Sequence, residues 1–188
     1  MNVKLYSVEE VHARMDALGM KIPDFHIVGI RSVEDAPDSF DDLMMLIYKL
    51  GGQWVCHYYS CTTNPGVHWL QNFANPNGSG ILKSDQQCFN AYQIGKHKGM
   101  YDALVQVREV TVFRDTDKDM KAEETGVLDT GLFGLNIHHA NKDLVSVVVG
   151  KWSAACQVLN NPKDFAQLMQ LCKESSQRFF TYTLLKEW

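Results

Sequence analysis

The stretch VVVGKWSAACQV, residues 147–158, contains the residue of this chain best suited to nucleophilic chemistry, Cys156. An apolar run comes first, and the small residues Ser-Ala-Ala then lead directly to the cysteine. A cysteine reacts through its thiolate, so it needs a neighbouring base or a positive electrostatic field. Small side chains before it leave room for backbone N–H groups to approach a reacting carbonyl. Cys156 is therefore the first candidate for a catalytic group.

The candidate base is His138, in the segment GLNIHH, residues 134–139. If this segment is a strand, Asn136 and His138 point to the same face, because side chains alternate along a strand. A second strand is expected over residues 144–152, so that Cys156 would follow it by one turn and could meet His138. The alternative is a buried core thiol and an ordinary strand histidine, since a chain with 7 His and 5 Cys offers many such pairs.

The two segments together resemble the L,D-transpeptidase catalytic domain of the YkuD type. The signature of that family is a His, a gap, and then Ser/Thr-His-Gly-Cys. His138 matches the first His, Ser153 the Ser/Thr and Cys156 the nucleophile. The 14 residues between His138 and Ser153 fit the gap of the family. The chain departs from the signature at Ala154, in place of the second His, and at Ala155, in place of the Gly.

Further segments extend the resemblance over residues 53–185. IGKHKG, ALVQ, VTVFRD, TGLFGLNIH, WSAACQV and FTYTLL occur in an order similar to that of a divergent branch of the family from phages and gut bacteria. The order of the predicted elements, N-terminal helices followed by a β-rich body with one late helix, indicates an α+β fold on a mixed or antiparallel sheet. The resemblance implies that this β-rich core is a β-sandwich.

The resemblance also implies an activity, a cysteine-dependent acyl transfer or hydrolysis on peptidoglycan stem peptides. Cys156 would attack a stem-peptide carbonyl, and His138 would accept the thiol proton. Cleavage, as by a phage lysin at the host cell wall, is favoured over cross-linking, and no metal or organic cofactor is required. The residues expected to hold the oxyanion or support the site are Asn136, His139, Ser153, Ala154 and Ala155.

The Ala154-Ala155 pair also favours an alternative of a different class. A non-catalytic structural or cell-wall-binding protein could be built on the same fold, because a methyl group at Ala155 could crowd the turn before the nucleophile. The sequence leaves this alternative open.

Another candidate for binding lies in QIGKHKGMYDAL, residues 93–104, which could hold a substrate carboxylate or form an ordinary solvated turn. The candidate substrate contacts are Lys96, His97, Lys98 and Tyr101, with Trp152 beside the candidate nucleophile.

Metal sites are not favoured. His138 and His139 should point to opposite faces of a strand, so they should not converge with Cys156 on a zinc ion. RDTDKDMKAEE, residues 114–124, begins like a calcium loop but lacks the glycine and the final glutamate of an EF-hand, which favours a solvated acidic loop.

Hydrophobic periodicity and capping signals predict the elements that must position these residues. Ser7 and Glu10 form a capping box at the start of an amphipathic helix over residues 7–18. Apolar residues at helical spacing predict a second helix over residues 38–50, and Asn-Pro at 161–162 begins a late helix. Strands are predicted over residues 53–63, 103–115, 134–139, 144–152 and 178–185, with loops and short strands over residues 73–100.

A chain of 188 residues is expected to form a single domain, with residues 1–52 a helical extension packed on the β-rich body. The net charge of −4, without a basic run, argues against a nucleic-acid partner. The N-terminal segment lacks the features of a signal peptide, and no apolar run reaches the roughly 18 residues that span a bilayer. We therefore expect synthesis in the cytoplasm and no stable membrane insertion; the oligomeric state stays open.

Overall fold

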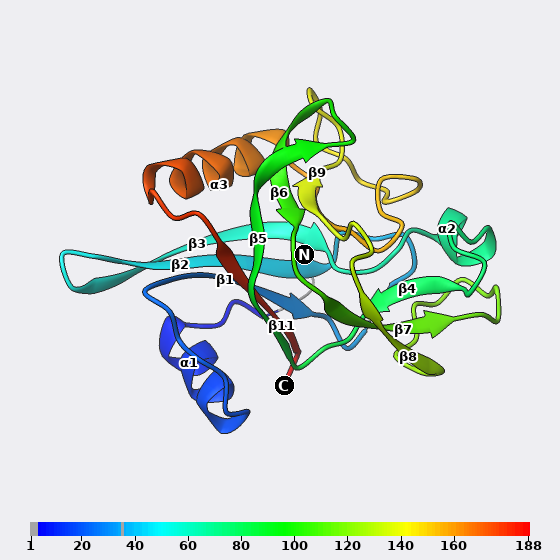
Figure 1. The fold of residues 1–188 in the computed structure, drawn as a ribbon, viewed down its shortest axis with the longest axis horizontal. Coiled ribbons are helices and arrows are strands. Elements are labelled where there is room, and N and C mark those ends of the chain that lie inside the picture. Colours follow the sequence, from blue (N-terminus) through cyan, green and yellow to red (C-terminus); the bar gives the residue numbers. More distant parts are fainter. Residues whose placement is uncertain (1–3, 35) are drawn as a thin grey trace.

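The computed structural model describes residues 4–34 and 36–188 (Figure 1). Eight strands close into a barrel: β1 (Phe25–Arg31), β2 (Asp42–Leu50), β3 (Gln53–Thr62), β5 (Gln86–His97), β6 (Tyr101–Gln106), β9 (Ile137–His139), β10 (Gln157–Leu159) and β11 (Phe180–Lys186). Around the barrel they are hydrogen-bonded in the order β1-β11-β5-β6-β9-β10-β3-β2. A separate three-stranded sheet contains β4 (Ser79–Leu82), β7 (Val110–Asp115) and β8 (Val127–Gly131), and lies to the right of the barrel in Figure 1.

Three helices complete the described part of the chain: α1 (Val8–Ala17), α2 (Val67–Gln71) and α3 (Pro162–Glu174). The first and last confirm the sequence prediction, including their capping residues. The side chain of Ser7 accepts a hydrogen bond from the Glu10 N–H, and the Glu10 carboxylate accepts one from the Ser7 N–H. The side chain of Asn161 accepts a hydrogen bond from the Lys163 N–H at the start of α3. None of the helices in residues 4–34 and 36–188 is long and apolar enough to cross a membrane.

The barrel has an apolar core on each side of its β1–β2 wall. Met44 and Leu46 of β2 face the barrel interior, where they join a buried cluster that includes side chains of α3. Their neighbours Leu43, Met45 and Ile47 face outward and pack in a second cluster with α1. Because side chains alternate along β2, this one strand contributes to both apolar cores.

The predicted helix over residues 38–50 is wrong, because most of this segment is β2. Both faces of the strand are buried, so apolar residues stand at every position and include those at helical spacing. The prediction of a helical extension over residues 1–52 is wrong as well, because this region contains β2 and a further strand. β1, which the sequence reading missed, pairs with β2 and with β11, so this region supplies two strands of the barrel.

The predicted strand over residues 144–152 is also wrong. This segment is irregular, and Leu144, Val145, Val147 and Val148 are all more than half exposed, so its apolar side chains do not belong to a sheet. The run 103–115 contains two strands, β6 in the barrel and β7 in the small sheet. The chain thus has the expected strand-rich α+β character, but its main sheet closes into a barrel where a sandwich was expected.

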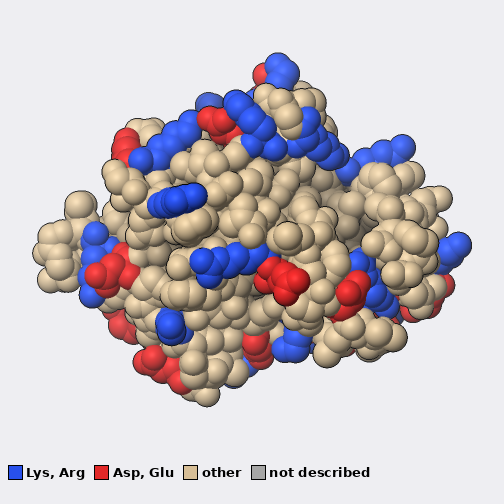
Figure 2. Space-filling view, in the orientation of Figure 1, with Lys and Arg blue, Asp and Glu red and all other residues tan. Residues whose placement is uncertain are grey.

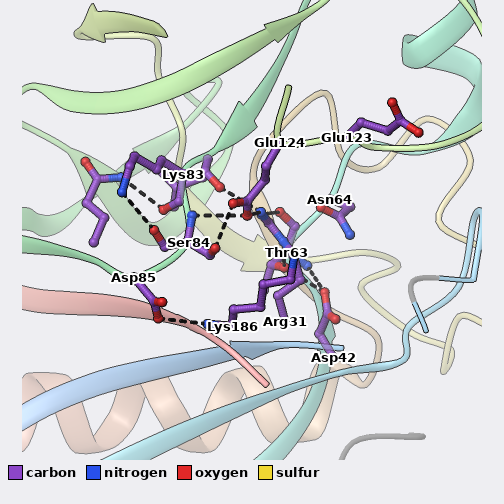
Figure 3. Close-up of polar contacts among 12 residues, drawn as sticks. Arg31, Asp42, Thr63, Asn64, Lys83, Ser84, Asp85, Glu123, Glu124 and Lys186 are labelled. Atoms are coloured by element: carbon purple, nitrogen blue, oxygen red, sulfur yellow. Dashed lines mark hydrogen bonds and ion pairs between the residues drawn. The ribbon is translucent and has the colours of Figure 1, made fainter. Parts of the chain in front are cut away.

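A buried polar network fastens the small sheet to the barrel (Figure 3). The Arg31 guanidinium donates hydrogen bonds to the Thr63 and Leu82 carbonyls and pairs with the Glu124 carboxylate, while Glu124 accepts from the Ser84 hydroxyl. Asp42 accepts hydrogen bonds from the Thr63 N–H and hydroxyl at 2.6 and 2.7 Å. Burial raises the pKa of Asp42 to about 6. These contacts hold β1, the end of β3 and the loop before β8 together, which fixes the distance between the two sheets.

Candidate active site

The β9–β10 pair places the candidate nucleophile and base on one face. β9 and β10 are parallel, with Ile137 opposite Gln157 and His138 opposite Val158. Gln157 faces the barrel interior, where its side-chain oxygen accepts a hydrogen bond from the buried Tyr182 hydroxyl at 2.8 Å. Because side chains alternate, His138 points to the outer face. Cys156, one residue before Gln157, shares that face.

On this outer face a cleft of about 560 Å³ separates the barrel from the small sheet. Cys156 and His138 both line it, together with Asn136 and His97. The opposite wall includes Gly80 and other residues of β4 and β7. The cleft therefore brings together residues from β5, the β9–β10 pair and the small sheet.

Hydrogen bonds fix the protonation pattern of the His138 ring. Nδ1 lies 2.7 Å from the His139 carbonyl oxygen and 3.2 Å from the Tyr101 hydroxyl. A carbonyl oxygen only accepts, so Nδ1 carries the hydrogen and Nε2 carries the lone pair. Nε2 is buried and has no hydrogen-bond partner among the described residues. A general base needs such a free lone pair to accept a proton.

His97 packs against the base. Its ring stacks on that of His138 with the centroids 4.1 Å apart. Burial, and secondarily the neighbouring His97, lower the pKa of His138 to about 3. Burial also lowers the pKa of His97. Both imidazoles are therefore neutral near pH 7.

Asn136 links the parts of the site. Its backbone N–H lies 3.4 Å from the Cys156 Sγ, and its side-chain NH2 donates to His97 Nδ1 at 3.0 Å. Its side-chain oxygen accepts from the Gln106 N–H on β6, and its carbonyl accepts from the Gln157 N–H on β10. One residue thus sets the positions of the thiol, the second histidine and two strands.

The Cys156 thiol is partly buried, and its Sγ lies 3.6 Å from the Gly134 carbonyl oxygen. Burial raises the pKa of this thiol, while the Asn136 N–H and the positive charge of Lys98 act in the opposite direction. The resting state is therefore a neutral thiol beside a neutral imidazole. Such a pair needs proton transfer during attack rather than a preformed thiolate.

The turn before Cys156 is held by Ser153 and strained at Ala155. The Ser153 hydroxyl donates to the Cys156 carbonyl at 2.8 Å and accepts from the Ala155 N–H at 3.3 Å. Ala155 has φ of 131°, a conformation that favours glycine. The position at which the family signature has Gly is therefore one where this backbone has a glycine-like conformation.

The remaining candidate residues divide between the cleft and its surroundings. Trp152 lines the cleft, whereas the His139 ring stacks on Tyr101 at 4.2 Å and lies outside this cleft. Lys96 does not line this cleft and forms an ion pair with Asp102 at 2.7 Å. The Tyr101 hydroxyl contacts His138 Nδ1 and so helps to position the candidate base.

Sequence reasoning missed the wall supplied by the small sheet. Arg114 of β7 lines the cleft and pairs with Asp129 at 2.8 Å. No local signal marked it, because β7 reads as an ordinary alternating strand. Lys151, which lies between the apolar loop and the nucleophile, was missed as well.

Within residues 4–34 and 36–188, no group of three or more His, Cys, Asp or Glu side chains could hold a metal ion. In the acidic loop, the Asp117 and Asp119 carboxylates accept hydrogen bonds from loop N–H groups two residues further on.

Comparison with known proteins found no matching family model, no similar curated protein and no similar solved structure. The function is therefore argued from the site itself.

Proposed function

We propose that this protein is a cysteine-dependent acyltransferase or hydrolase of the L,D-transpeptidase type, acting on peptidoglycan stem peptides. The observation that supports it best is the shared cleft. The Cys156 thiol lies there with His138, whose buried Nε2 has a lone pair and no partner among the described residues. A thiol and a free base in one cleft are the two groups that nucleophilic acyl transfer needs.

The reaction begins with attack by Cys156 Sγ on a peptide carbonyl, while the thiol proton moves to His138 Nε2. The new C–S bond gives a tetrahedral intermediate, whose oxyanion backbone N–H groups around residues 154–156 would hold. Collapse of the intermediate breaks the C–N bond, and the leaving amine takes the proton from His138. Water then hydrolyses the thioester, or an amine replaces water and forms a cross-link.

Two contacts of His138 support this role. The His139 carbonyl holds the Nδ1 proton, so the ring keeps the tautomer with Nε2 free to accept. The stacked His97 ring, itself anchored by Asn136, restricts rotation of the base. Hydrolysis is the favoured outcome by analogy with wall-cleaving phage enzymes.

A non-catalytic wall-binding protein is the second candidate. The observation that favours it is Ala155, a non-glycine residue with positive φ directly before the nucleophile. Ala154, in place of the second His of the signature, adds to this argument.

Digestion of purified sacculi separates the two candidates. We expect the protein to release soluble muropeptides, the Cys156→Ala variant to release none, and the Cys88→Ala variant to retain activity. Cys88 is a matched control because its thiol is buried in the barrel core, away from the cleft. Intact sacculi with all three proteins, together with retained binding to the sacculi, would instead support the binding protein.

A further inference from the structure

A second cleft, of about 870 Å³, adjoins the first. The two share His97 and His138, so the candidate base lies where they meet. Tyr101 and His139 belong to the second cleft only, and Cys156 to the first only. A ligand that reaches the reacting bond from the second cleft must therefore pass the shared residues.

The shared rim is positively charged. Lys98 and Lys151 line both clefts, both are exposed, and neither takes part in an ion pair within residues 4–34 and 36–188. Among the described residues lining the two clefts, Asp143 is the only acidic one, and it is paired with Lys142 at 3.0 Å. This local excess contrasts with the net charge of −4 of the whole chain.

Figure 2 shows blue side chains gathered along the upper edge of the molecule. In Figure 1 the β5–β6 hairpin and the loop between β9 and β10 lie along this same edge. These two segments carry Lys98 and Lys151. Red side chains also lie along this edge in Figure 2, and the acidic partners of Lys96 and Lys142 are Asp102 and Asp143.

In the β5–β6 hairpin, Lys98 has a left-handed backbone conformation that is uncommon for residues other than glycine. Lys98 has φ of 49°, and the following Gly99 has φ of 74°. A two-residue turn of this kind favours Asn-Gly, because both residues need positive φ. The positive charge of Lys98 lowers the pKa of Cys156, His97 and His138, which places its ammonium group within electrostatic reach of all three.

We propose that Lys98 and Lys151 form a carboxylate-binding subsite where the two clefts meet. The subsite makes the protein take stem peptides with a free carboxylate near the reacting bond in preference to the same peptides with a carboxamide. The identity of the ligand as a stem peptide rests on the proposed function. Trp152, which also lines both clefts and is 44% exposed, offers an apolar surface to the aliphatic part of the peptide.

Charge explains the preference. A carboxylate is attracted by both ammonium groups and can accept a charge-assisted hydrogen bond from either, whereas a neutral carboxamide gains only weak interactions. Exposed ion pairs contribute little individually, so we expect the carboxylate peptide to bind roughly three- to tenfold more tightly than the carboxamide.

The test is calorimetric titration of the full-length Cys156→Ala protein, which binds without turnover. Two synthetic stem tetrapeptides serve as probes, identical except for a carboxylate or a carboxamide on the diamino acid. We expect the carboxylate preference to disappear when Lys98→Gln or Lys151→Gln is added. Lys163→Gln is the control, because this exposed α3 lysine removes the same charge but lines neither cleft.

Equal affinity for the two peptides would overturn the subsite, and so would failure of both to bind. Lys98→Gln would also overturn it by weakening the binding of both peptides equally. So would Lys163→Gln, the charge control, if it removed the carboxylate preference as Lys98→Gln does. These outcomes are distinguishable from failure of the proposed function. Intact sacculi after treatment with the unaltered protein would refute catalysis, while a carboxylate preference in the Cys156→Ala protein would still stand.

Discussion

The β1–β2–β3 wall of the barrel and the β9–β10 wall that carries the site are built in opposite ways. β2 and β3 pair over nine residues on each strand, whereas β9 and β10 pair over three. The long wall is apolar on both faces around β2. The short wall carries His138, whose Nε2 has no partner among the described residues. Ala155, which has positive φ, lies just before β10. The long wall is the more regularly paired of the two, and the short wall carries the residues proposed to react.

Each wall also holds a buried neutral histidine, and the two differ in their contacts. His26 of β1 has both ring nitrogens engaged, one 2.6 Å from the Pro23 carbonyl oxygen and the other 3.3 Å from His12 Nε2. His138 of β9 has one nitrogen engaged and one free. This difference supports the proposal that His138, and not His26, is the general base, and the following predictions test the contrast.

The largest effect is expected from His138→Gln. Loss of a general base lowers the rate of acyl transfer by roughly 10²- to 10⁴-fold. The matched change His26→Gln should leave the rate per folded molecule within about threefold, a margin below the smallest loss expected of a catalytic base. Release of muropeptides from sacculi measures both, and equal rates for the two variants would remove the distinction between the histidines.

Leu46→Ala should lower the stability of the protein without changing its rate. Leu46 is fully buried in the barrel interior, so its truncation should cost about 2–5 kcal/mol in the free energy of unfolding. The rate of the folded fraction should not change, because Leu46 lines neither cleft. Urea unfolding followed by fluorescence checks the cost, and a loss of less than about 1 kcal/mol would show that the wall is loosely packed.

Acid should destabilise both walls through their histidines. Burial lowers the pKa of His26 from 6.5 to about 4 and that of His138 to about 3. The unfolded chain therefore takes up protons first as the pH falls below 6.5, and stability present above pH 6.5 is lost on the way to about pH 3. Between pH 7.5 and pH 4, either His→Gln variant should lose roughly 2–3 kcal/mol less than the unaltered protein. An unchanged loss in both variants would contradict this.

The smallest effect concerns the strained turn. Ala155→Gly relieves roughly 1–3 kcal/mol of backbone strain, against roughly 1–2 kcal/mol for the lost methyl burial and added chain entropy. Ala154→Gly lacks the relief, because Ala154 does not have positive φ. We expect Ala155→Gly to be about 1 kcal/mol more stable than Ala154→Gly in thermal unfolding. The reverse order would show that Ala155 is unstrained.

Local signals made parts of this fold predictable. The capping box at Ser7 and the Asn-Pro start of α3 each lie within four residues, so the chain around them needs no tertiary context. β2 could not be recognised because both its faces are buried, which removes the alternation that identifies a strand. Val147 and Val148 led to the opposite error: their apolar run predicted a strand, but the segment is irregular and both side chains are exposed. Apolar content alone does not show whether a segment will be buried.

Only those parts of the site that depend on local sequence were predictable. Alternation correctly placed Asn136 and His138 on one face, because it depends on strand geometry alone. The strand beside His138 was misplaced, since β10 follows Cys156 rather than preceding it. The contribution of Lys151 and of the small sheet depends on tertiary contacts between distant segments, which no spacing in the sequence encodes.

The most direct test of the central claim is intact-mass spectrometry of the protein mixed with a stem tetrapeptide and quenched in acid. We expect a covalent adduct with the mass of the acyl portion of the peptide, mapped to Cys156 by proteolysis. The adduct should be absent from Cys156→Ala and should form much more slowly in His138→Gln. Failure to detect any adduct while sacculi are being cleaved, or an adduct on Cys56 or Cys88 instead, would contradict the assignment of Cys156 as the nucleophile.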